Sequence, residues 1–139
     1  MGWNDTVIEE FRAGKARIAD MFDQGSLLLL HTVGAKSGQP RTSPVAFFHD
    51  GDRILVVASA AGSDHHPDWY HNLRANPKVQ VELWEDGELK TIPAGARTAD
   101  DTEHDELWAQ IVAHAPGFGE YQTKTSRKIP VVVVEPAGS

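Results

Sequence analysis

Two cations lie five positions apart in one short segment of an acidic chain. Lys36 and Arg41 both belong to residues 32–44, which read Thr-Val-Gly-Ala-Lys-Ser-Gly-Gln-Pro-Arg-Thr-Ser-Pro. Gly34 and Gly38 permit the positive backbone angles and the close approach that a tight, ligand-wrapping turn needs. Apolar runs flank the segment on both sides, which predicts that it is held between two strands of one sheet. A basic loop held in this way can receive an anion.

The same residues also fit an ordinary hairpin loop whose two cations are simply exposed to solvent. The sequence leaves both interpretations open. A nucleotide-binding P-loop is a third interpretation, which the spacing excludes. That motif needs Gly, four residues and then Gly-Lys-Ser/Thr at the start of a helix. Here Lys36-Ser37 precedes Gly38, and Pro40 and Pro44 oppose a helix.

An aromatic pair beside an amide is the second feature that could bind a ligand. Trp69 and Tyr70 are followed by Asn72 within a predicted short helix. An aromatic plane next to an amide suits a flat heterocycle that needs stacking and a hydrogen bond. The same pair would equally anchor a helix in a hydrophobic core, so it favours a ligand only together with the basic loop. Tyr121 could cover the same pocket and donate a proton.

The densest group of potential metal ligands lies just before and within the predicted short helix. Its members are Asp64, His65, His66, Asp68 and His71. Neither the two-histidine helical motif of zinc hydrolases nor a glycine-spaced calcium loop is present, so we interpret these histidines as solvated and predict no metal. Ser59 lacks the Gly-x-Ser-x-Gly setting of a hydrolase nucleophile.

Composition narrows the function classes. The 139 residues fit one domain, carry a formal net charge of -7 and include no cysteine. The acidic balance argues against a nucleic-acid partner, so any anion binding must be local. The absence of cysteine fits a reducing compartment. With no signal peptide and no run long enough to cross a bilayer, we expect a cytoplasmic protein.

The N-terminal segment predicts a helix over about residues 5–13. Thr6 and Glu9 have the spacing of a capping box, and Val7, Ile8 and Phe11 share one face. We expect that face to pack on the domain. The alternative is peripheral membrane contact through an amphipathic segment.

Apolar runs separated by turn signals predict the rest of the fold. Strands are expected at residues 27–32, 45–49, 53–59, 79–83, 89–97 and 129–135, and helices at 68–73 and 100–114. Asp50-Gly51 and Asp86-Gly87 are hairpin turns, and Pro116-Gly117 ends the second helix. Six strands in hairpin order with short flanking helices predict a mainly β, α+β fold built on a small antiparallel barrel.

Several spaced segments together match one known family. They are Leu27 to Thr32, Gly34-x-Lys36-Ser37-Gly38-Gln39-Pro40-Arg41, Ala58-Ser59, Trp69-Tyr70-x-Asn72-Leu73, Asn76-Pro77, Tyr121-Gln122 and Ile129-Pro130-Val131-Val132. The chain resembles the deazaflavin-dependent nitroreductase family over nearly all of its length after about Phe11. The resemblance implies a six-stranded split β-barrel of the FMN-binding type. It also implies binding of the deazaflavin coenzyme F420, whose reduced form passes a hydride to an acceptor.

The resemblance also implies where the cofactor binds. F420 carries a phosphate and an oligoglutamate tail, which Lys36 and Arg41 would hold with help from backbone N–H groups near Ser37 and Gly38. The remaining implied cofactor-binding residues are Thr42, Ser43, Pro44, Val45, Ala46, Val57, Ala58, Ser59, Ala60, Asp68, Trp69, Tyr70, His71 and Asn72. Ser59 and Tyr121 are the candidate catalytic residues, and Phe118 and Tyr121 the candidate substrate-binding residues.

The acceptor is expected to be an electron-poor small molecule, a quinone or a nitro compound. Family members that reduce nitroimidazole prodrugs or quinones have a lysine after the Ala-Ser pair and several tyrosines on the substrate side. Here Ala60 replaces that lysine, and Ala115 and Phe118 stand where tyrosines are expected. These departures weaken the expectation of nitro-prodrug reduction more than that of F420 binding.

Three alternatives stay open from the sequence: an F420-binding or carrier protein without turnover, an FMN-dependent reductase of the same fold, and a non-catalytic interaction module. A homodimer is also expected, because barrels of this kind often pair.

Overall fold

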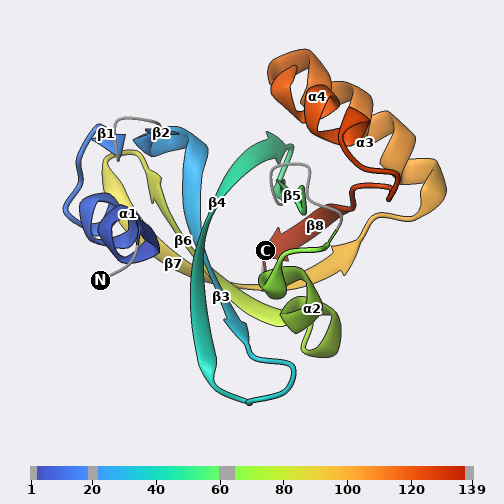
Figure 1. The fold of residues 1–139 in the computed structure, drawn as a ribbon. Helices are drawn as coiled ribbons and strands as arrows, with labels where there is room; N and C mark the ends of the chain where they lie inside the picture. The colour runs from blue at the N-terminus through green and yellow to red at the C-terminus, as the bar shows by residue number, and fades with distance from the viewer. Residues whose placement is uncertain (1–2, 19–21, 60–64, 137–139) are drawn as a thin grey trace.

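Six antiparallel strands close into a barrel in the order β3–β4–β5–β8–β7–β6 (Figure 1). The computed structural model describes residues 3–18, 22–59 and 65–136. The strands are β3 (Leu27–Val33), β4 (Pro40–Asp50), β5 (Arg53–Val57), β6 (Lys78–Glu85), β7 (Glu88–Thr98) and β8 (Val131–Pro136). The predicted six-stranded antiparallel barrel is confirmed. Asp86 and Gly87, with φ of 54° and 78°, form the predicted turn between β6 and β7.

The most apolar strands are buried on both faces because helices cover the outside of the barrel. In β3, Leu28 and Leu30 point into the barrel, whereas Leu27 and Leu29 pack outside. The valines of β8 divide in the same way, so residues 131–134 are all fully buried. The interior is filled by Leu28, Leu30, Val45, Phe47, Ile54, Val56, Val79, Val81, Leu83, Ala94, Ala96, Val132 and Val134. Burying each leucine contributes roughly 1.5–3 kcal/mol.

Helix α1 (Trp3–Arg12) covers the outside of β3. Val7 and Phe11 are fully buried in one cluster with Leu27 and Leu29, and the indole of Trp84 donates to the Phe11 carbonyl at 2.8 Å. The packing predicted for this face is therefore confirmed for Val7 and Phe11. No helix in the described ranges has the length and apolar character needed to span a bilayer.

Helix α2 (Asp68–Ala75) lies beside the β3–β4 hairpin, and Trp69, Tyr70 and Leu73 contribute to the barrel core (Figure 1). Helix α3 (Asp101–His114) begins with a complete capping box between Asp100 and Glu103. It packs on the other side of the barrel from α1.

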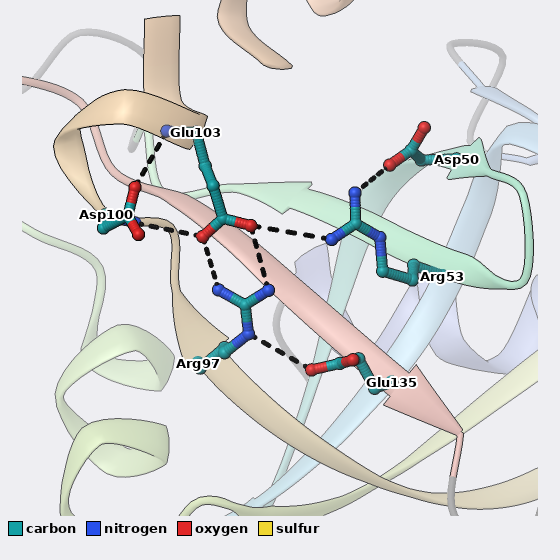
Figure 2. A network of polar contacts seen from close by, with 6 residues as sticks. All are labelled: Asp50, Arg53, Arg97, Asp100, Glu103 and Glu135. Atoms are coloured by element: carbon teal, nitrogen blue, oxygen red, sulfur yellow. Dashed lines mark hydrogen bonds and ion pairs between the residues drawn. The ribbon is translucent and has the colours of Figure 1, made fainter. Parts of the chain in front are cut away.

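A network of charged residues connects α3 with residues of β4, β5, β7 and β8 (Figure 2). Glu103 on α3 accepts two hydrogen bonds from Arg97 on β7, at 2.7 and 3.0 Å. Arg97 also donates to Glu135 on β8 at 3.2 Å, and Arg53 on β5 lies 3.7 Å from Glu103 and pairs with Asp50. The hydrogen bonds from Arg97 lower the pKa of Glu103 to about 2.

Among the differences from the sequence prediction, three concern β4, β5 and the segment after Pro116. Strand β4 begins at Pro40, not Val45. Its residues 40–46 pair with β3 alone, and β5 joins only from Phe47. The other edge of residues 40–46 is therefore open and accommodates Pro40 and Pro44. Strand β5 ends at Val57, two residues before Ser59. After the predicted stop at Pro116-Gly117 a further helix follows, α4 (Gly117–Thr123), with Pro116 as its N-cap.

Three short elements were also not predicted. Strands β1 (Arg17–Ile18) and β2 (Phe22–Asp23) form a separate two-stranded sheet, followed by the 3-10 helix η1 (Gln24–Ser26). Strands of two residues are too short to show an alternating pattern.

Candidate functional site

A cleft of about 570 Å³ opens between the β3–β4 loop, the start of β4 and α2. Its lining residues are Gly34, Ala35, Lys36, Ser37, Arg41, Thr42, Ser43, Asp68, Trp69, His71 and Asn72. The structure thus brings the basic loop and the aromatic helix together, as the sequence predicts. A second, more apolar groove of about 630 Å³ lies along β3, β6 and β7, and none of the predicted site residues lines it.

The basic loop is closed by its own backbone. Gly34 N–H donates to the Gln39 carbonyl at 2.8 Å, and Gly38 N–H donates to the Gly34 carbonyl at 3.0 Å. Gly38 has a φ of 70°, which favours glycine. A Cβ added to Gly34 would lie 2.4 Å from the hydroxyl oxygen of Ser37, whose Oγ also accepts a hydrogen bond from Gln39 N–H at 3.2 Å. Gly38 therefore suits the backbone angle of this turn, and a side chain at Gly34 would displace the Ser37 hydroxyl.

Asn72 joins α2 to the basic loop. Its side-chain oxygen accepts a hydrogen bond from Ala35 N–H at 2.9 Å, and its side-chain nitrogen donates to Thr32 Oγ1 at 3.3 Å. Asn72 is buried, so these bonds satisfy an amide that would otherwise be costly to bury. The predicted hydrogen bond to a heterocycle stays a prediction, and the structure gives this side chain the further task of holding the cleft wall.

Lys36 and Arg41 bring positive charge to the cleft. Both side chains are exposed, and neither forms an ion pair with any residue that the structure describes. Several other cations of the chain are neutralised by carboxylates, among them Arg12 by Glu82 at 2.6 Å and Lys128 by Asp101 at 3.0 Å. Among the described residues that line the cleft, Asp68 is the acidic one.

Strand alternation decides which β4 side chains face the cleft. Arg41 and Ser43 pair with the inward-facing residues Thr32 and Leu30, so they share the inner face. Thr42 pairs with His31 on the outer face, and its hydroxyl lies 3.1 Å from His31 Nδ1.

That contact continues along the outer face to the neighbouring strand β6. His31 Nε2 lies 2.5 Å from Glu82, which also binds Arg12 of α1. The hydrogen bond from Arg12 is the largest cause that holds the pKa of Glu82 below its usual value. Thr42 therefore borders the cleft while its hydroxyl is used on the other face.

The two neighbouring aromatic residues of α2, Trp69 and Tyr70, have different surroundings. Trp69 lines the cleft and also belongs to the barrel core, so the core interpretation is confirmed and stacking on a ligand stays a prediction. Tyr70 is buried in the core, and its hydroxyl lies 3.0 Å from Thr98 Oγ1. Tyr70 therefore does not line the cleft with its neighbour.

The predicted substrate-side residues lie elsewhere. Phe118 and Tyr121 are on α4, where the Phe118 ring packs edge-on against Phe48 with ring centres 5.8 Å apart. They join an outer cluster with Leu55 and Val57. Like them, the predicted residues Gly38, Pro44, Val45, Ala46, Val57, Ala58 and Ser59 are not among those lining the cleft. Ala60 lies outside the described residues, and the roles of all these residues stay predictions.

The histidines next to α2 do not form a metal site in the described part of the chain. No group of three or more His, Asp or Glu side chains there is placed to share an ion. Asp64 lies outside the described residues. His66 contacts the rings of Tyr70 and His71 instead, at centre distances of 4.8 and 5.7 Å.

Sequence reasoning missed Arg127, which lies between α4 and β8. Its guanidinium contacts the backbone of Ala58 and Ser59 and the ring of His66. No local pattern signals such a contact, because the partners are more than 60 positions away along the chain.

Comparisons with known proteins identify the family of this chain. The family model described as F420H(2)-dependent quinone reductase matches residues 3–136. The chain belongs to this family. An F420H2-dependent quinone reductase of Mycobacterium tuberculosis strain H37Rv is 44% identical over 110 residues, covering 77% of this chain and 71% of that protein. The predicted family and its split-barrel fold are confirmed.

Solved structures of similar proteins support the same assignment to the F420H2-dependent quinone reductase family. A structure described as an F420-H2 dependent reductase (FDR-A) is 39% identical, covers 79% of this chain and 94% of its own, and has a TM-score of 0.68. A second, described as a domain-swapped dimer, is 34% identical, covers 94% and 98%, and has a TM-score of 0.70.

Proposed function

We propose that this protein uses reduced coenzyme F420 to reduce a quinone or a comparably electron-poor small molecule. The observation that carries the proposal is a pair of cations, Lys36 and Arg41, that have no carboxylate partner among the described residues. They line the same cleft as Trp69, which is buried. Family membership supplies the reaction class, and the cleft supplies a place where an anionic, ring-bearing cofactor fits.

The residues of the cleft fit the chemistry of F420. Its phosphate and glutamate carboxylates need cations and N–H donors, which Lys36, Arg41 and the Ser37 end of the loop offer. Its flat ring needs an apolar wall, which Trp69 offers. A cleft of about 570 Å³ is of the usual size for a small-molecule site. When bound, reduced F420 supplies the hydride.

The protein's own contribution is to bind, orient and keep water away. Asn72 fixes the loop against α2, which keeps the backbone of the basic loop beside the helix that carries Trp69. We assign Ser59 and Tyr121 to the acceptor side, where the Tyr121 hydroxyl would donate a proton to the reduced product. Phe118 would provide an apolar surface for the acceptor.

We also infer a homodimer and a cytoplasmic location. A relative 34% identical is described as a domain-swapped dimer, which supports the first inference. The cysteine-free composition supports the second. Light scattering after size-exclusion chromatography tests the dimer directly, and a monomer across micromolar concentrations would refute it.

The deciding experiment has two steps. The purified protein is titrated separately with F420 and FMN by fluorescence, and is then mixed with reduced F420 and a menadione-type quinone. The proposal expects preferential F420 binding and quinone-dependent reoxidation of the cofactor. Binding without reoxidation would indicate a carrier, preferential FMN binding a flavin enzyme, and no binding an interaction module. Any of these three outcomes overturns the proposed reaction.

A further inference from the structure

One arginine contacts both ends of the connection between β5 and α2. Arg127 Nη1 donates to the Ala58 carbonyl at 3.1 Å, and Nη2 donates to the Ser59 carbonyl at 2.8 Å. Nη1 also lies 3.0 Å from Nδ1 of His66, just before α2. A single half-buried guanidinium therefore holds three groups from two places in the chain.

The two carbonyls need such a partner because the strand ladder stops there. Pairing of β5 with β8 ends at Val57 and Val131, and the last backbone bond runs from Ala58 N–H to the Pro130 carbonyl at 3.0 Å. Ala58 and Ser59 are nonetheless buried. Buried carbonyls without ladder partners are costly, and an arginine fork can satisfy two of them at once.

The arginine is itself held in place. Its backbone N–H donates to Thr125 Oγ1 at 3.3 Å, and its carbonyl accepts a hydrogen bond from the Gln122 side chain at 2.7 Å. Gln122 is on α4, next to Tyr121. The arginine thus connects the helix that carries the predicted acceptor-side tyrosine to the strand end that carries Ser59.

The contact with His66 defines the state of that ring. A guanidinium has only N–H donors, so a hydrogen bond at this contact requires Nδ1 of His66 to accept, and therefore a neutral ring with its proton on Nε2. Among the residues that the structure describes, Arg127, Tyr70, His71 and Arg74 face the ring. Burial first, and then the charges of Arg127, His71 and Arg74, lower the pKa of His66 below its ordinary value.

We propose that Arg127 is a positioning residue, which fixes Ser59 at the end of β5 and does so together with a neutral His66. Protonation of His66 would set a cation against the guanidinium and release the contact. The contact is therefore intact at and above the ordinary histidine pKa of 6.5 and is lost as the pH falls through the lowered pKa. The inference about Ser59 rests on the proposed function, whereas the state of His66 does not.

The test uses four variants and two independent measurements. His66→Asn keeps an acceptor for Arg127 but does not titrate. Arg127→Gln removes the charge, and Arg127→Lys keeps the charge but loses the fork. Lys128→Ala removes a neighbouring cation, which pairs with Asp101 outside the contact, and serves as the matched control.

The first measurement is a pH titration of the histidine ring nitrogens by NMR, which needs neither F420 nor turnover. His66 is expected as the Nε2–H tautomer with a pKa below 6.5, and Arg127→Gln is expected to raise that pKa while Lys128→Ala leaves it unchanged. A protonated Nδ1 in the neutral ring, or an ordinary pKa unaffected by Arg127→Gln, overturns the inference.

The second measurement is kcat and F420 affinity against pH. Arg127→Gln and Arg127→Lys should lower kcat about tenfold or more, with F420 affinity changed much less, because misplacement of an acceptor-side group costs turnover. In the unmodified protein, kcat should fall as the pH drops through the pKa of His66. His66→Asn should keep the kcat measured at neutral pH and should not show this fall. Unchanged kcat in both arginine variants, or an acid decline that persists in His66→Asn, overturns the positioning role. Absence of F420-dependent turnover in the unmodified protein refutes the proposed function instead, and with it the role of Ser59.

Discussion

Removal of both cleft cations is the most direct perturbation of the binding argument. Replacing Lys36 and Arg41 with alanine should weaken F420 binding, because both side chains are exposed at the cleft and neither pairs with a described carboxylate. An exposed cation about 4 Å from an anion gains about 1 kcal/mol in water and up to about 4 at a protein surface. Taking about 1–2 kcal/mol for each cation gives roughly 2–4 kcal/mol together, or about a 30- to 700-fold rise in Kd.

The assay is a fluorescence titration with F420 at two salt concentrations, with FMN as the comparison ligand. Screening should weaken F420 binding to the unmodified protein more than binding to the variant. FMN has a phosphate but no glutamate tail, so its affinity should fall less. The matched control is Lys15→Ala with Lys90→Ala, which removes the same charge from exposed pairs with Glu10 and Glu85 that do not line the cleft.

Two results would refute the reasoning. Unchanged F420 affinity in the double variant would mean that the loop does not hold the anionic tail. An equal loss in the control would mean that net charge, and not the position of the two cations, governs binding.

Three further predictions test the parts that support the cleft. Asn72→Ala should lower the free energy of unfolding by about 1–3 kcal/mol and weaken F420 binding, because a loop N–H loses its acceptor; unchanged urea unfolding would contradict this. Gly34→Ala should weaken F420 binding at a stability cost of about 1–3 kcal/mol, since the new Cβ lies 2.4 Å from the Ser37 hydroxyl; Gly25→Ala, with nothing within 4 Å, is its control. Glu103, whose pKa is about 2, should add stability that is full above its ordinary 4.5 and is lost as the pH falls to about 2. Urea unfolding of Glu103→Gln should lack that part of the acid dependence, and an unaltered pH profile would exclude it.

The barrel could be predicted because its local signals agree with its tertiary structure. The runs at Leu27–Leu30 and Val131–Val134 indicate burial on both faces, and helices do cover the outside of those strands. Asp86 and Gly87 supply the left-handed angles that a tight hairpin needs. Where pattern, turn chemistry and packing coincide, the sequence is sufficient.

The errors arose where tertiary context overrode local preference. Pro40 and Pro44 argue against a strand, yet the open edge of β4 leaves no ladder bond for them to break. Gly117 and Gly119 argue against a helix, yet α4 forms with Phe118 packed on Phe48 and Tyr121 in the same outer cluster. Neither outcome could be read from propensity, because both depend on which strand or cluster lies opposite.

The site was predictable in its parts and not in its connections. The loop and the helix each carry recognisable residues, and the structure places both at one cleft. The bond from Ala35 to Asn72 spans 37 positions and that from Arg127 to Ser59 spans 68. Such contacts follow from how the barrel closes, so a single sequence contains no local pattern for them.

The distribution of ion pairs separates cations that hold the fold from cations available to a ligand. Four cations each lie against a carboxylate: Arg12, Arg53, Arg97 and Lys128. These ion pairs attach helices or a hairpin to the barrel. Lys36 and Arg41 have no such partner in the described ranges, although the chain has an excess of acidic groups. A net charge of -7 repels large polyanions, whereas two cations on one small arc still attract a compact anion. Selectivity should therefore come from the combination of that anion with a flat ring at Trp69, and a ligand with only one of the two features should bind weakly.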